Sequence, residues 1–251
     1  MLHMNEFLLV LGTASITAFL TFLGALLAER LEAPRQVISA ALQLAAGSII
    51  AVVAFTLMPP AVQAAPPLLS MSAFSVGGIL FVVMDYVTGA RQSSQSSAAS
   101  ESNSLGLYLG VLIDMAIDGV AIGIGSALTL GAGLIVAAGL AVSNMPLAFL
   151  TIATARRQGM PPQRRRLLSI AFMGIILAGA LLGYLVLSGQ SELVRSALVA
   201  LVSGFLITMV TLTMIPEARQ QSAERLLGMF FIGGWRCSPC WRSSDIDQPF
   251  E

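Results

Sequence analysis

Long stretches without a single charged side chain dominate this sequence and restrict what the chain can fold into. Charged residues make up only 10% of it, whereas a soluble globular domain contains about 25%. A helix needs roughly 20 apolar residues to cross the hydrocarbon core of a bilayer, and each stretch is long enough for at least one such helix. The uncharged stretches lie between Glu6 and Glu29, Arg35 and Asp85, Asp118 and Arg156, Arg166 and Glu192, and Arg195 and Glu217.

Helices are the architecture that fits these stretches. Inside a bilayer, only helices and closed barrels satisfy all of their backbone hydrogen bonds. The stretches are too long and too uniformly apolar for the alternating strands of a membrane barrel. We therefore predict an all-α, polytopic membrane helix bundle. The first apolar segment has neither a basic flank nor a small-residue cleavage site, so we interpret it as a retained helix and not as a cleaved signal.

Seven transmembrane helices are expected. The stretch after Arg35 is long enough for two of them, and the proline pairs at 59–60 and 66–67 are expected to separate these two. Gly131 and Gly133 are expected to separate the fourth helix from the fifth. The predicted spans are 7–28, 37–58, 72–90, 105–127, 132–154, 167–188 and 196–216.

The two ends of the chain differ in character. We expect residues 1–225 to form one transmembrane domain, interrupted by a polar, low-complexity and flexible cytoplasmic loop at residues 92–104. Residues 226–251 are expected to hold a short, incomplete eighth helix and a polar tail. The apolar stretch from Leu226 to Trp235 is too short to span, and the chain turns polar at Arg236. A truncation or a change of reading frame would explain this ending.

Arginine predicts the orientation, because positively charged short loops stay in the cytoplasm. The loop between the fifth and sixth spans carries five arginines, and placing it inside also places Arg30, Arg35 and Arg91 inside. Only Arg195 then lies on the opposite side. We expect the N-terminus outside and the protein in the plasma (inner) membrane. The five arginines are Arg156, Arg157, Arg164, Arg165 and Arg166.

An internal similarity links the second and seventh spans. Residues 47–61 read GSIIAVVAFTLMPPA, and residues 204–218 read GFLITMVTLTMIPEA, with six of these positions identical. In the predicted topology the two helices cross the membrane in opposite directions. Inverted repeats of this kind are a common construction of transporters.

Two carboxylates lie within the fourth span. Asp114 and Asp118 are four residues apart, so they share a helix face and lie about 6 Å apart along the axis. A charge near the bilayer centre costs roughly 2.5–3.5 kcal/mol, and this span offers no basic partner. A divalent cation could compensate for the pair, or the two groups could share a proton and support proton coupling. In the alternative interpretation, one of them is simply hydrated near the membrane surface.

The fifth span carries a second polar group around a proline. Pro146 is expected to free the carbonyl of Val142, which lies beside Ser143 and Asn144. A hydroxyl, an amide oxygen and a carbonyl could add oxygen ligands to those of the fourth span. A kink that improves packing, with Asn144 bonded to a neighbouring helix, is the alternative. The glycines of the fourth span are expected to allow another helix to approach closely; they are Gly119, Gly123 and Gly125.

These residues resemble the ZIP (Zrt/Irt-like) family of divalent-metal transporters. The family's fourth helix carries a pattern like HNxxDGxAIG, where residues 114–123 read DMAIDGVAIG, and its fifth helix a pattern like HNxPEG, where residues 143–148 read SNMPLA. The IPEA at 215–218 also resembles the family's seventh helix. The resemblance covers roughly residues 7–230. It implies eight helices, both termini outside, and a metal site between helices four and five that opens to one side at a time.

The chain departs from that pattern at most ligand positions. Asp114 and Ser143 stand where the family has histidines, Met115 replaces an asparagine, and Leu147 and Ile176 replace glutamates. The metal ligands that remain are expected to be Asp118 and Asn144, with Asp114 and Ser143 as substitutes. Such a site is richer in oxygen ligands, so it should favour oxygen-preferring ions over zinc.

From these observations we expect a transporter of divalent metal cations, zinc-like or another transition metal, and not an enzyme. The expected partners are the cation as substrate and the lipid bilayer, with no cofactor and no nucleic acid; a homodimer is left open. One alternative is a degenerate, non-transporting ZIP homologue that acts as a membrane interaction or regulatory subunit. Another is a proton-coupled carrier of a different solute, with the Asp pair as the relay.

Overall fold

The computed structural model describes residues 2–32, 34–88, 101–221 and 228–237, and every element in these ranges is helical. Seven of the described helices are long and apolar enough to cross a membrane. The protein is therefore an integral membrane helix bundle, and the predicted all-α class is confirmed. The elements are α1 (Leu2–Arg30), α2 (Arg35–Val52), η1 (Val53–Leu57), α3 (Met58–Gln63), α4 (Pro67–Thr88), α6 (Glu101–Leu128), α7 (Leu130–Arg157), α8 (Pro162–Leu187), α9 (Glu192–Met209), η2 (Val210–Met214), α10 (Ile215–Gln221) and α11 (Gly228–Cys237).

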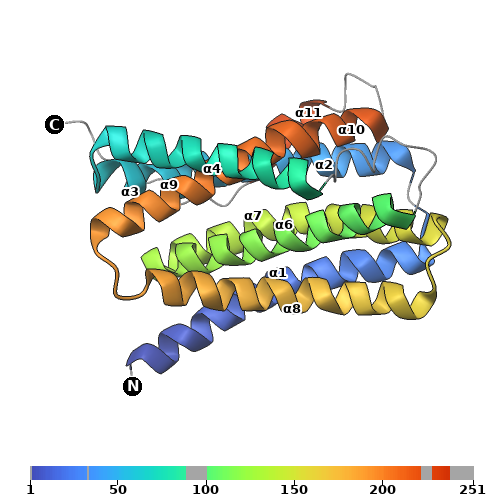
Figure 1. Ribbon diagram of the computed structural model, residues 1–251, viewed down its shortest axis with the longest axis horizontal. Helices are drawn as coiled ribbons and strands as arrows, with labels where there is room; N and C mark the ends of the chain where they lie inside the picture. Colours follow the sequence, from blue (N-terminus) through green and yellow to red (C-terminus); the bar gives the residue numbers. More distant parts are fainter. Residues whose placement is uncertain (1, 33, 89–100, 222–227, 238–251) are drawn as a thin grey trace.

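The helices pack as two layers (Figure 1). The first bundle consists of α1, α6, α7 and α8, which pack on one another; the second bundle consists of α2, α3, α4, α9, α10 and α11. The main contact between the two bundles is the packing of α2 on α7. A side-chain atom at Gly139 of α7 would run into Val52 of α2, so the two helices approach closely there.

The prolines at 59–60 do not end the second span, which corrects the prediction. The helix continues through them to Gln63 as the π-helical turn η1 and then α3. Proline lacks an N–H and its ring crowds the carbonyl four residues earlier, and a widened π turn makes room for it. The break comes later, at the turn before Pro66, and α4 begins at Pro67.

The boundary between the fourth and fifth spans also differs from the prediction. Gly131 and Gly133 lie inside α7, and the break is at Thr129. The Thr129 side chain accepts a hydrogen bond of 3.0 Å from the backbone N–H of Ala132 and so caps the helix. Of the predicted flexible loop, residues 92–100 lie outside the described residues, whereas residues 101–104 form the first turn of α6 and are not loop.

The internal repeat is longer than the sequence similarity that first indicated it. Arg35–Gln63 and Glu192–Gln220 are each 29 residues long, and eleven positions are identical without a gap. Each consists of an 18-residue helix, a five-residue π-helical turn and a short helix with proline at its second position. The Ser39 hydroxyl, near the start of one copy, donates to the Ala218 carbonyl, near the end of the other, at 2.6 Å. The copies therefore run in opposite directions.

The repeat also includes α4 and α11, at the same offset in residue number that relates the two 29-residue copies. Gly77 of α4 lies against the backbone of Leu201, and Gly234 of α11 lies against the backbone of Leu44. These two glycines are separated in the sequence by the same number of residues as Pro59 and Pro216. The two leucines have this separation too. The described part of the predicted eighth helix, α11, is thus the counterpart of α4, and it packs on α2. Residues 238–251 of the predicted polar tail lie outside the described residues.

Candidate functional site

The helix that carries the two carboxylates is held by its glycines against α8. A side-chain atom at Gly119 or Gly123 of α6 would run into the backbone of Ile176 or Ala180. Gly179 and Gly183 of α8 are equally blocked by the backbone of α6. The contacts advance together along both helices, so α6 and α8 run parallel, with glycines four residues apart on each. This spacing is typical of close helix pairs in membranes, and it fixes the position of α6.

The expected close approach at the glycines of α6 is therefore confirmed, although the sequence did not identify the partner. Gly125 packs against a different helix, where an added side-chain atom would lie 3.1 Å from Val136 of α7. Gly179 and Gly183 were missed. Their spacing of four residues matches that of Gly119 and Gly123 and was the available signal.

Asp114 and Asp118 both lie inside the bundle. The side chains are exposed by only 8% and 1%, and the two carboxylates are close enough to interact electrostatically. Neither forms an ion pair with an arginine in the part of the chain that the structure describes. The alternative interpretation, in which one of them reaches water at the membrane surface, does not fit this burial.

Ser143 and Asn144 come from α7, which runs through Pro146 as one continuous helix. Both side chains are 1% exposed. The Ser143 hydroxyl donates to the carbonyl of Leu140 at 2.9 Å and lies 3.3 Å from Oδ1 of Asn144. The amide of Asn144 is within interaction range of the Asp118 carboxylate. The structure thus places Asp118 of α6 near Asn144 of α7, with Asp114 next to Asp118 and Ser143 next to Asn144.

This cluster contains buried polar atoms without a partner. Both carboxylate oxygens of Asp118, Oδ1 of Asp114 and Nδ2 of Asn144 make no hydrogen bond of standard geometry among the described residues. Buried polar atoms are almost always hydrogen-bonded, and each exception calls for an explanation such as an ion or water. Rotating the Asn144 amide by 180° would present an oxygen in place of Nδ2. The cluster could then offer a cation several oxygen ligands and no nitrogen or sulfur.

Apolar side chains fill the other positions at which the resemblance expects ligands. Met115 and Ile176 are fully buried in the core, and Leu147 packs against it. No group of three or more His, Cys, Asp or Glu side chains comes together in the part of the chain that the structure describes. Any cation held here would depend on Asp114 and Asp118 for charge and on α7 for neutral oxygen atoms.

Neither a protein-family model nor a curated protein matches this chain.

Proposed function

We propose that the protein transports divalent cations across its membrane through the site between α6 and α7. The observation that carries this proposal is the pair Asp114 and Asp118, which are buried next to each other; among the described residues, their oxygens include three without a hydrogen-bond partner, and neither carboxylate pairs with an arginine. Two carboxylates in such surroundings destabilise the protein unless a positive charge offsets them. A divalent cation carries the charge that balances both.

The ligand chemistry favours ions that accept oxygen. Carboxylate, amide and hydroxyl oxygens suit manganese and magnesium better than they suit a thiophilic metal. Zinc also accepts carboxylate ligands, so it belongs among the candidates. We propose that manganese-like ions are preferred over zinc, which is the order expected when aspartate and serine stand in the place of histidines.

The division into two bundles supports a mechanism of alternating access. The proposed ligands all belong to the first bundle, whereas the second bundle consists of the inverted repeat. A shift of α6 and α7 against these repeat-related helices would open the site to one side at a time. The end of the molecule that carries Arg30, Arg35 and Arg156 is proposed to face the cytoplasm, which places the N-terminus outside.

Metal uptake by proteoliposomes tests the proposal. Vesicles containing the full chain are loaded with a metal-sensitive dye and exposed in turn to manganese, zinc and magnesium. The intact protein is expected to raise uptake of at least one of them, and Asp118→Ala is expected to lower that uptake to the level of empty vesicles. Glu192→Ala is the matched control, because Glu192 begins α9 at the far end of the bundle. Equal uptake by the intact protein and Asp118→Ala would exclude a metal route through this residue.

One alternative has an observation in its favour. The absence of a third acidic, histidine or cysteine ligand from the cluster, among the described residues, favours a homologue that binds a cation weakly and does not transport. In that case no tested cation enters the vesicles above the control level, although the purified protein remains folded. The same assay therefore separates the two functions.

A further inference from the structure

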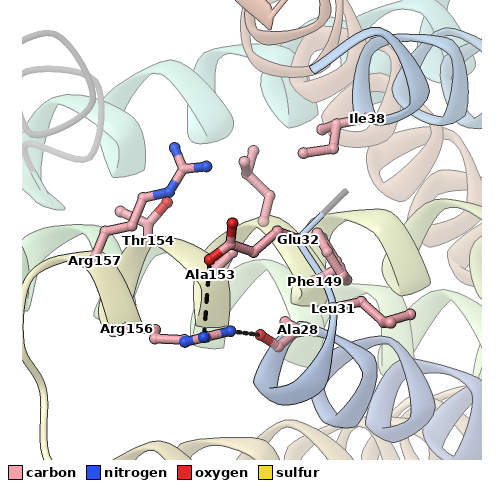
Figure 2. A pocket seen from close by; sticks show the side chains of 10 residues that line it. Ala28, Leu31, Glu32, Ile38, Phe149, Ala153, Thr154, Arg156 and Arg157 are labelled. Atoms are coloured by element: carbon pink, nitrogen blue, oxygen red, sulfur yellow. Dashed lines mark hydrogen bonds and ion pairs between the residues drawn. The ribbon is translucent and has the colours of Figure 1, made fainter. Parts of the chain in front are cut away.

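A cavity of about 240 Å³ opens at the arginine-rich end of the molecule. It lies between the last turn of α1, the start of α2 and the last turns of α7 (Figure 2). All three segments end or begin there as membrane-spanning helices. The cavity is therefore at the level where lipid headgroups meet the protein.

The two arginines that line this cavity differ in their hydrogen bonding. Arg156 is tied to the protein: its guanidinium donates to the carbonyls of Ala28 and Glu29 at 3.4 Å and lies 3.9 Å from the Glu32 carboxylate. The Arg157 guanidinium makes no hydrogen bond or ion pair with any residue that the structure describes. Figure 2 shows its guanidinium beside Thr154 at one side of the cavity.

Apolar side chains form the rest of the wall. Leu31 lines the cavity from the segment after α1, Ile38 from α2 and Phe149 from α7. The lining thus combines an uncommitted guanidinium and a hydroxyl with a hydrocarbon surface. A molecule that carries a phosphate next to an acyl chain matches both parts.

We propose that this cavity binds the headgroup phosphate of an anionic phospholipid from the surrounding leaflet. The planar fork of a guanidinium pairs two of its N–H groups with two phosphate oxygens, and Arg157 has its donors available. Basic pockets between transmembrane helices are a recurring setting for anionic headgroups. Glu32 opposes such a ligand by its negative charge, so it lowers the affinity and favours release.

Lipid binding to the purified full chain tests the proposal. Dioctanoyl phosphatidylglycerol, dioctanoyl phosphatidylcholine and inorganic phosphate are titrated separately against the detergent-solubilised protein, and the bound species are measured by native mass spectrometry. Phosphatidylglycerol is expected to bind more tightly than phosphatidylcholine. Arg157→Gln is expected to weaken its binding about fivefold to tenfold, which is the effect of losing one charge-assisted contact at a partly exposed site.

Three further variants make the test specific. Glu32→Gln is expected to strengthen phosphatidylglycerol binding, and Ala153→Leu, which fills the cavity without changing its charge, is expected to abolish it. Arg164→Gln is the matched control, because Arg164 is an exposed arginine of the same end that does not line the cavity. The proposal is overturned if Arg164→Gln and Arg157→Gln have equal effects, or if inorganic phosphate binds as tightly as the lipid.

Discussion

Arg195 of α9 donates from Nη2 to the carbonyl oxygen of Ala127, the penultimate residue of α6, at 2.6 Å. The bond joins the two bundles, since α9 belongs to the second and α6 to the first. The carbonyl groups at the end of a helix carry partial negative charge and are stabilised by a cation. In the predicted orientation Arg195 lies on the side opposite the arginine-rich loop, and this contact gives it a structural role there: it stabilises the end of α6.

Removing that contact should loosen the join between the bundles. Arg195→Gln is expected to lower the free energy of unfolding by about 1–2 kcal/mol, because a charge-assisted hydrogen bond at a half-buried site is lost. Thermal unfolding in detergent measures the effect. Arg164→Gln removes an exposed arginine and should leave the melting temperature unchanged. An equal loss in both variants would contradict a specific role for Arg195.

The glycine contact between α6 and α8 should tolerate no side chain. Gly179→Ala is expected to destabilise the protein by about 1–3 kcal/mol, because the added methyl group meets the backbone carbonyl of Ala116. Gly174→Ala on the same helix is the matched control, since its added methyl group meets nothing within 4 Å. It should be neutral or slightly stabilising, as alanine is a better helix former than glycine. Melting temperatures of the two variants decide the matter.

The site itself should be a source of instability when no cation is bound. Asp118→Asn keeps the shape of the side chain but removes a buried acidic group whose oxygens have no hydrogen-bond partner among the described residues. In the presence of a chelator, this variant is expected to be more stable than the original protein, by about 1–3 kcal/mol. Functional sites often exchange stability for activity in this way.

The response of the melting temperature to added manganese tests whether Asp118 is a metal ligand. A cation that binds only the folded protein raises its melting temperature, and the rise should be seen in the original protein and not in Asp118→Asn. Glu192→Gln serves as the control and should keep the full response. If Asp118→Asn responds to manganese as strongly as the original protein, Asp118 is not a ligand.

The ion pair between Glu29 and Arg165 should contribute more to stability than the pair of Arg156 and Glu32 at the same end. Arg165 meets both carboxylate oxygens of Glu29 at 2.7 Å, and both side chains are largely buried. A double-mutant cycle with Glu29→Gln and Arg165→Gln is expected to give a coupling of about 1 kcal/mol. The exposed pair of Arg156 and Glu32, 3.9 Å apart, should show no measurable coupling in the same kind of cycle.

The number of spans and the class of the fold followed from the sequence because a bilayer imposes a strong rule on composition. Where charge is missing for more than 20 residues, few alternatives to a helix exist. Helix ends were less certain. Proline usually ends a helix, but at Pro59 and Pro216 a π-helical turn accommodates the ring and the helix continues. Composition alone does not tell whether a proline will end a helix or be accommodated in it.

Within the site, the pairing of Asp114 with Asp118 was predictable from their spacing alone. The position of Asn144 beside Asp118 required that consecutive helices pack together, which short connections make the usual arrangement. The contact of α6 with α8, the contact of Arg195 with Ala127 and the cavity beside Arg157 all depend on which helices become neighbours across the chain. That information is tertiary and is not carried by the periodicity of any single segment.

The parallel glycine contact makes α6 and α8 one mechanical body, and this has a practical consequence. Backbones in such close contact cannot slide past each other, so any displacement of Asp118 must be shared by α8. The helix α8 presents several exposed side chains, among them Leu182 and Leu185. A spin label at either position would report, from the lipid side, every movement of carboxylates that no probe could reach directly.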